Sequence, residues 1–195
     1  MTSPSTCVNT IRTGRRISST AAVSFTQDES PAGTEADNEG DSNADNCCLG
    51  ANFMALEISN RTAEVYPYDP SYEPIANVPI VTGATACDDE QGTTFILIFH
   101  ESLFYGKKLR NSLKNPNQVR HHGIDFWDNP FDHRQTLSID IPGELHIPLK
   151  YQGTRLSFTS RVPTRNDFST CQHIEITSPV PWEPSEVRLG QVTRK

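Results

Sequence analysis

Residues 93–99 form a nearly continuous apolar run, Thr-Thr-Phe-Ile-Leu-Ile-Phe. The run is short for a helix, and its β-branched and aromatic residues favour a strand. A strand without polar alternation is typical of one that is covered on both faces. Residues 88–92, just before it, have the composition of a hairpin turn. The chain is therefore expected to fold around a sheet with residues 93–99 near its centre.

Further short runs with strand character surround this one. The predicted strands cover residues 53–58, 62–66, 77–81, 137–141 and 156–160. Asn60-Arg61 is predicted to form a turn between the first two of them. Residues 107–122 are the best helix candidate, which Pro116 breaks or restarts. Many short strands with one short helix near the C-terminal part predict a mainly β fold, either closed or sandwiched.

The two ends of the chain differ in composition from its middle. Residues 2–40 are rich in small, polar and acidic residues and are predicted to be disordered, because they offer little apolar surface to bury. From Ser178 onward, three prolines follow in quick succession and indicate a linker. With 195 residues, 35% of them hydrophobic, the chain can build one core. We therefore expect one modest domain with disordered termini.

The charge balance narrows the classes of partner. A net charge of −7 and a pI of about 5.3 argue against nucleic acid. No apolar run is long enough to span a bilayer, and the N-terminus lacks the pattern of a signal peptide. An intracellular, cytoplasmic protein without a membrane partner is therefore predicted.

The cysteines and histidines do not form a metal-binding pattern. The five cysteines, odd in number and irregular in spacing, are Cys7, Cys47, Cys48, Cys87 and Cys171. Such a set is typical of reduced thiols inside cells, and adjacent cysteines do not fit the spacing of a zinc pair. His121, His122 and His133 have no paired cysteines at suitable spacing either. We expect buried thiols, and neither a metal nor a cofactor.

One hexapeptide has the composition of a catalytic loop. Residues 41–46 read Asp-Ser-Asn-Ala-Asp-Asn and precede Cys47-Cys48-Leu49-Gly50. Hydrolysis of a peptide by water needs two carboxylates in contact that share one proton, one acting as base and the other as acid. A single motif of this kind supplies one of them, so a second copy of the chain would supply the other. Taken alone, the hexapeptide also fits a surface turn of the Asx type.

The order Asp-Ser-x-Ala-Asp resembles the protease segment of copia-type retrotransposon polyproteins, which are a branch of the retropepsins. Farther along, residues 111–126, Asn-Ser-Leu-Lys-Asn-Pro-Asn-Gln-Val-Arg-His-His-Gly-Ile-Asp-Phe, are similar to a stretch near the end of that domain. The resemblance implies a retropepsin-like acid-protease barrel over residues 38–161. Residues 1–37 would then be a disordered linker, and residues 162–195 a C-terminal extension or linker.

The resemblance also implies roles for the loop residues. Asp41 would be the catalytic carboxylate, and Ser42 would donate a bond that stiffens the dimer. Asn43 stands where retropepsins usually carry Gly, at a position expected to need an unusual backbone angle. Ala44 completes the loop, and Asp45 would support it and contact the main chain of the substrate. Two segments, Phe104-Tyr105-Gly106 and Asn111–Leu113, could each support the catalytic strand.

A retropepsin closes a mobile hairpin, the flap, over its substrate. By spacing, the flap should lie in residues 66–74, where Tyr66, Tyr68 and Tyr72 could cover a peptide. The segment has three prolines and no glycine, unlike the Gly-rich flaps of retroviral enzymes, so an ordinary exposed loop is the alternative.

Together these features predict an aspartic endopeptidase that acts as a homodimer on polypeptide, namely on its own polyprotein. The alternative is a catalytically inactive remnant that keeps the fold as a dimerisation or scaffold module. Asn43 and the Pro-rich flap favour the alternative, whereas Asp41, Ser42 and Asp45 favour the enzyme.

Overall fold

A computed structural model of the chain describes residues 12–14, 29–67, 69 and 71–187. It is mainly β, which confirms the predicted class. The strands are β1 (Arg12–Gly14), β2 (Glu35–Gly40), β3 (Cys48–Leu49), β4 (Met54–Tyr66), β5 (Ile75–Asp88), β6 (Thr94–Phe104), β7 (Ser112–Lys114), β8 (Asp125–Trp127), β9 (Ser138–Ile141), β10 (Leu145–Pro148), β11 (Lys150–Gln152), β12 (Arg155–Arg161) and β13 (Gln172–Glu175). The helices are η1, a 3₁₀ turn (Gly106–Lys108), α1 (Pro116–His121) and α2 (Arg165–Thr170).

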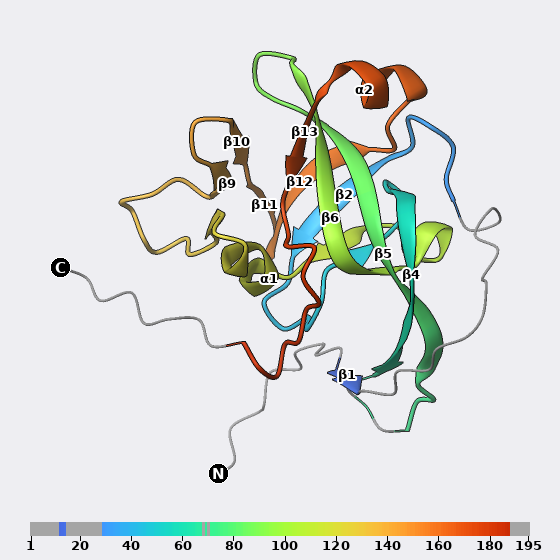
Figure 1. Cartoon of the computed structure of the whole chain (residues 1–195). Coiled ribbons are helices and arrows are strands. Elements are labelled where there is room, and N and C mark those ends of the chain that lie inside the picture. Colours follow the sequence, from blue (N-terminus) through green and yellow to red (C-terminus); the bar gives the residue numbers. More distant parts are fainter. Residues whose placement is uncertain (1–11, 15–28, 68, 70, 188–195) are drawn as a thin grey trace, which may run out of the picture.

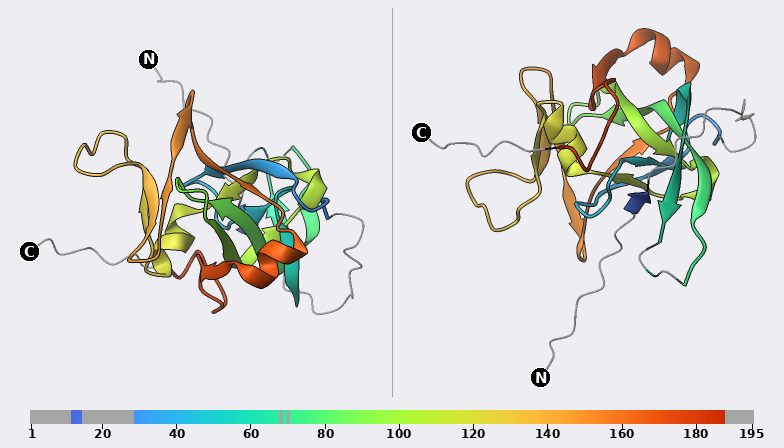
Figure 2. Two further views of the ribbon diagram at one scale, coloured as in Figure 1. Left: turned by 90° about the horizontal axis from the view of Figure 1, so that it is seen from above. Right: turned by 60° about the horizontal axis from the view of Figure 1, so that its bottom comes forward.

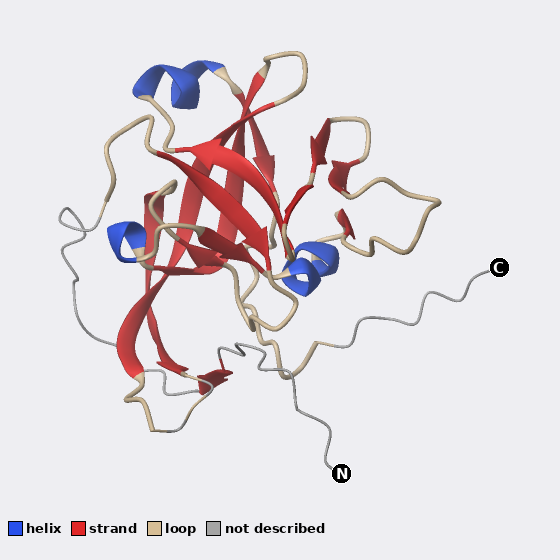
Figure 3. Ribbon diagram, turned by 180° about the vertical axis from the view of Figure 1, so that it is seen from behind, coloured by secondary structure: helices blue, strands red, loops and turns tan. Residues whose placement is uncertain are grey.

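The main sheet closes on itself. Its strands follow the order β5-β12-β2-β7-β3-β6, and β6 pairs again with β5. The apolar run predicted to be central lies in β6, which pairs with β5, β3 and β13 and has Ile96, Leu97 and Phe99 fully buried. Figures 1 and 3 show the strands forming the body of the molecule, with the short helices at its periphery.

The hairpin of β4 and β5 extends beyond this closed sheet. β4 runs without a break through Asn60-Arg61, so the predicted turn there is wrong. The register instead shifts between Ile58 and Thr62, an irregularity that lets one strand bend without reversing. β1 pairs with β4 near the tip, and Figures 1 and 2 show α2 at the opposite end of the molecule.

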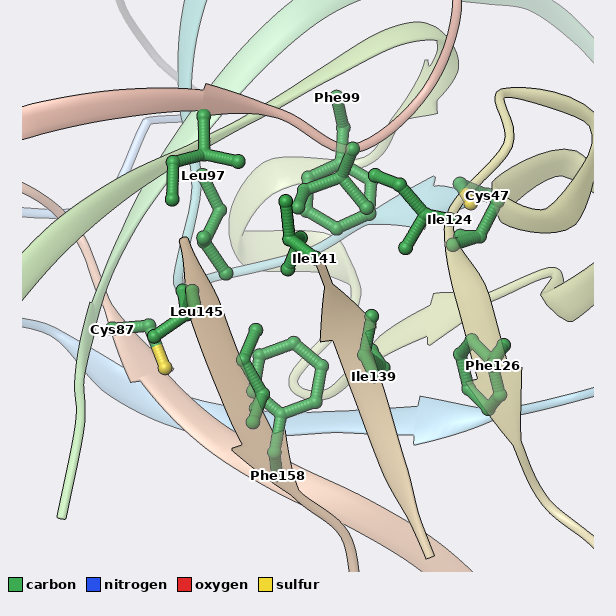
Figure 4. Packing of buried hydrophobic residues seen from close by; sticks show 14 of the residues in the cluster. Cys47, Cys87, Leu97, Phe99, Ile124, Phe126, Ile139, Ile141, Leu145 and Phe158 are labelled. Atoms are coloured by element: carbon green, nitrogen blue, oxygen red, sulfur yellow. The ribbon is translucent and has the colours of Figure 1, made fainter. Parts of the chain in front are cut away.

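A smaller sheet of β10, β9 and β8 completes the core. Successive side chains of its strands point to opposite faces of the sheet, so that Ile139, Ile141 and Leu145 are buried while Asp140 and His146 are less buried. Figure 4 shows these apolar side chains directed toward Leu97 and Phe158 of the closed sheet. One continuous core therefore joins the two sheets.

A network of buried polar side chains ties the strands of the closed sheet together. Asn52 Nδ2 donates to Asn38 Oδ1 at 3.2 Å, and Ser112 Oγ donates to Asn52 Oδ1 at 2.6 Å. Thr85 Oγ1 donates to the Asn52 carbonyl at 2.8 Å and lies 2.6 Å from Ser160 Oγ. All five side chains are almost fully buried. Because these groups are satisfied by one another, the register of β2, β5, β7 and β12 is fixed.

The closed sheet extends past both predicted domain limits. β2 occupies residues 35–40, within the segment predicted to be disordered, and pairs with β12 and β7, so the disorder predicted for these residues is wrong. Beyond residue 161, α2 begins with a capping box formed by Thr164 and Asp167, and β13 pairs in parallel with β6. The extension predicted at residues 162–195 is thus part of the folded domain at least as far as β13.

The helix predicted over residues 107–122 is present only in part. Its first half contains η1 and β7, and α1 begins at Pro116, where the proline occupies the first turn that tolerates it. With α2, the described residues contain two α-helices where one was predicted. None of the described helices is long and apolar enough to cross a membrane.

Candidate functional site

The candidate catalytic loop, residues 41–47, joins β2 to β3. β7 lies between these two strands, parallel to β2 and antiparallel to β3. One short strand therefore holds both ends of the loop. Of the two segments considered as its support, Asn111–Leu113 overlaps β7. Phe104-Tyr105-Gly106 begins at the last residue of β6, where Phe104 pairs with Leu49 on the other edge of β3. Both segments flank the loop strands.

Asp41 is held by main-chain groups. Its N–H donates to the Lys114 carbonyl at 2.9 Å, which continues the pairing of β2 with β7. Its Oδ1 accepts the Asn43 N–H at 2.9 Å, and its carbonyl accepts the Ala44 N–H at 3.3 Å. The side chain is half-buried, and the next two residues are exposed. The carboxylate is thus fixed in orientation at the surface, where another molecule can reach it.

The backbone of Asn43 is ordinary. Among the described residues, the non-glycine positions with positive φ are Asn77 and Glu101. The prediction that Asn43 needs the angle of a glycine is therefore wrong. Its N–H nevertheless makes the contact with Asp41 that the loop requires, and an N–H is present in any residue except proline. Asn in place of Gly does not distort this loop.

The second half of the loop is buried against α1. Ala44, Asn46 and Cys47 are at most 8% exposed. The Cys47 N–H donates to Gln118 Oε1 at 2.8 Å, and Gln118 Nε2 donates to the Glu101 carbonyl at 3.1 Å. Gln118 thereby links the loop, through α1, to β6.

Asn115 connects the same helix to Asp45. Its Oδ1 caps α1 by accepting the N–H groups of Asn117 and Gln118, at 2.8 and 3.3 Å. Its Nδ2 donates to the Asp45 carbonyl at 2.9 Å. Sequence reasoning missed this residue as part of the site. An Asn directly before a Pro is a standard signal for a helix start and could have identified it.

Lys114 lies fully buried behind the loop, and sequence reasoning missed it as well. Its Nζ has no hydrogen-bond partner and sits 4.1 Å from the ring centre of Phe53 and 4.7 Å from that of Phe99. Burial lowers the pKa of Lys114 from 10.5 to about 7, although the nearby Cys47 and Cys48 act in the opposite direction. Burial also raises the pKa of the Cys48 thiol to about 12, so this thiol is protonated at neutral pH.

The thiols of the described residues are free, and Cys47, Cys48 and Cys87 are buried as predicted. In the parts of the chain that the structure describes, no three His, Cys, Asp or Glu side chains come together as a metal site would need.

The flap candidates lie at the tip of the β4–β5 hairpin. Tyr66 ends β4, and Tyr72 lies in the connection to β5, with 40% and 68% of their surfaces exposed. Tyr68 falls outside the described residues. The connecting segment is thus a hairpin tip with exposed aromatic side chains.

The segment predicted to be a linker packs on the loop instead. Residues 178–187, here termed the strap, follow β13 and run past α1 toward the loop, as the red trace in Figure 1 shows. Trp182 Nε1 donates to the Asp45 carbonyl at 2.8 Å, and its ring lies 5.4 Å from that of His121. Trp182, Pro184 and Val187 line an open pocket of about 370 Å³ together with Ser42, Ala44, Asp45, Asn115 and Asn117.

Comparisons with known proteins leave the family open. No protein-family model matches this chain, and no curated protein or solved structure matches it significantly.

Proposed function

We propose that the chain is an aspartic endopeptidase of the retropepsin type, which acts as a homodimer and processes a copia-type retrotransposon polyprotein. The observation that carries this proposal is the geometry at Asp41. A carboxylate lies in a loop between two strands that are both held by a third strand, and one oxygen accepts a main-chain N–H from two residues farther on. The closed sheet supplies the rigid support that such a loop needs.

The chemistry requires two copies of this loop. A water molecule becomes a nucleophile when one carboxylate takes its proton while the other, protonated, polarises the peptide carbonyl. When two carboxylates are in contact, they cannot both be ionised, so the pair holds one proton and titrates as a unit. Asp41, paired with Asp41 of a second molecule, would form this pair, and the mechanism needs no cofactor.

The surroundings suit an extended polypeptide. Ser42 and Asn43 are exposed beside Asp41, and Ser42 would bond across the dimer. Asp45 presents its carbonyl to the same side and already accepts two hydrogen bonds there. Tyr66 and Tyr72 on the hairpin tip would close over the bound peptide. Junctions in the extended linkers of the parent polyprotein are the substrates that fit this arrangement.

The alternative is an inactive scaffold module, and one observation favours it. The strap occupies the Asp45 side of the loop in the single chain, which is where a peptide would run. A permanently covered loop could not bind a substrate peptide. The alternative retains dimerisation but requires no catalysis.

The deciding experiment compares Asp41→Asn with Asp125→Asn. Asp125 is an exposed carboxylate on β8 and serves as the matched control. Each variant is assayed for self-cleavage in an extended chain and for degradation of fluorescein-labelled casein at acidic pH, with melting and sizing alongside. Asp41→Asn should abolish cleavage and leave fold and dimer intact, while the control behaves as wild type. A wild type that dimerises but never cuts would leave the scaffold function standing.

A further inference from the structure

We propose that the strap is an intramolecular inhibitor, which occupies the place of a peptide beside Asp45 and must leave before substrate or a second copy can dock. This inference rests on the proposed function and adds a means of regulating the same site. It follows from what the strap contacts, from how it is attached, and from its composition.

The strap contacts the loop as a bound peptide would. Its anchor is Trp182, whose indole N–H donates to a main-chain carbonyl of the loop, at Asp45. Its later residues, Pro184 and Val187, line the same pocket as Ser42 and Ala44. Five of the eight residues that line this pocket belong to the loop and the start of α1, and three belong to the strap. While the strap is seated, a second chain cannot approach this side of the loop.

The attachment points of the strap are specialised. The Trp182 N–H donates to Glu101 Oε2 at 3.2 Å, and the other carboxylate oxygen of Glu101 pairs with Arg61. Glu101 has a φ of 49°, a left-handed conformation that a Glu rarely adopts. Strain of this kind persists where the surrounding structure requires it, and it gathers at functional positions. Here it aims one carboxylate at both the β4 hairpin and the strap.

The composition of the strap suits reversible docking. Pro179, Pro181 and Pro184 provide no N–H groups, so the strap cannot join the sheet as a regular strand. Prolines also keep the free segment extended, which lowers the entropy lost when it docks. Trp182 anchors the strap through both its main-chain and its indole N–H groups. A segment held this way binds the loop tightly enough to cover it and weakly enough to be displaced.

The test uses the full chain with Trp182→Ala, Trp182→Phe and the control Val180→Ala. Val180 lies in the strap with 66% of its surface exposed, and its N–H bonds only to Ser178 within the strap. Trp182→Phe keeps a ring but loses the donor to Asp45. Melting curves establish that each variant folds. Cleavage of labelled casein, with and without pepstatin A, is then measured together with amide exchange in residues 41–46 and with the dimer dissociation constant.

We expect Trp182→Ala to raise pepstatin-sensitive cleavage roughly fivefold or more and to tighten the dimer by a similar factor, because one net hydrogen bond and ring packing are lost. Trp182→Phe should lie between Trp182→Ala and wild type, and Val180→Ala should match wild type. If wild type cleaves and Trp182→Ala cleaves no faster, the inhibitor role is refuted and the protease stands. If no variant cleaves, the protease fails, and the dimer constants decide: a tighter Trp182→Ala dimer supports the strap as a cover of the loop, and an unchanged one refutes it.

Discussion

Replacing Lys114 by Met should stabilise the fold, and the gain should depend on pH. Lys114 is fully buried without a hydrogen-bond partner, and burial lowers its pKa from 10.5 to about 7. Met has nearly the same length and no charge to desolvate. The substitution therefore removes an ionisable group and leaves the packing against Phe53 and Phe99 almost unchanged.

The magnitude follows from the two pKa values. A fall from 10.5 to about 7 costs about 5 kcal/mol, at ~1.4 kcal/mol per pH unit. Cation–π contacts with the two rings favour the charged form and offset about 1–2 kcal/mol of this cost. We therefore expect Lys114→Met to gain about 3 kcal/mol near pH 6.

The lowered pKa of Lys114 determines the direction in which stability changes with pH. The pKa of Lys114 is lower in the folded state than in the unfolded chain, so the unfolded chain binds more protons between about pH 7 and 10.5. The contribution of Lys114 to the free energy of unfolding therefore rises with pH across that window and is constant below it. The advantage of the Met variant, ~3 kcal/mol near pH 6, should therefore fall toward zero between about pH 7 and 10.5.

Urea unfolding of both proteins at intervals from pH 6 to 10 measures this difference directly. Lys107→Met is the control, because Lys107 is exposed and its substitution should change little at any pH. If the difference in free energy of unfolding between Lys114→Met and wild type stays constant over this pH range, the pKa of Lys114 is not lowered by burial and the argument is refuted. A destabilised variant at pH 6 would show that the cation–π contacts outweigh burial.

Three further results are expected. Thr85→Val should lower the free energy of unfolding by about 1–3 kcal/mol in urea, because the buried Asn52 carbonyl loses its hydroxyl donor and Ser160 Oγ loses its contact with the Thr85 hydroxyl. Asn115→Ala should cost about 1–2 kcal/mol through the lost helix cap, and should also speed amide exchange in the loop; a stability loss without faster exchange would contradict the link to Asp45. Cleavage should fall toward alkaline pH, where the shared proton is lost, and should rise more than linearly with enzyme concentration near the dimer dissociation constant; strict proportionality from a species shown to be monomeric would exclude the two-chain mechanism.

The strands that could be predicted from the sequence are those whose own residues show an apolar or alternating pattern. Residues 93–99, 137–141 and 156–160 lie in β6, β9 and β12 because their apolar or alternating residues suit strands in any context. β2 was missed because its sequence, Glu-Ala-Asp-Asn-Glu-Gly, is polar and acidic. It becomes a strand only through its neighbours β12 and β7, which no local pattern reveals.

The candidate site was predictable as a loop but not as an assembly. The order of residues around Asp41 indicated a turn, and the structure has a loop there, between β2 and β3. The side chains that hold the loop, such as Gln118 and Trp182, lie 71 and 137 residues from their contacts. The contact of Trp182 with the loop could not be predicted, because a Pro-rich segment alone does not reveal what it packs on. Lys114 was missed because burial of a lysine depends on the whole surrounding core.

The closure of the main sheet determines when its strands can pair during synthesis of the chain. β2 is among the first strands to leave the ribosome, yet Asn38 pairs with Ser112 and with Phe158, which is 120 residues later in the chain. The acidic strand must therefore wait, unpaired, until nearly the whole domain has been translated. Pairing between residues this far apart in sequence slows folding, because the entropy of closing a long loop is lost before any hydrogen bond between the strands can form. Its negative charges keep the waiting strand from pairing with other chains in the meantime.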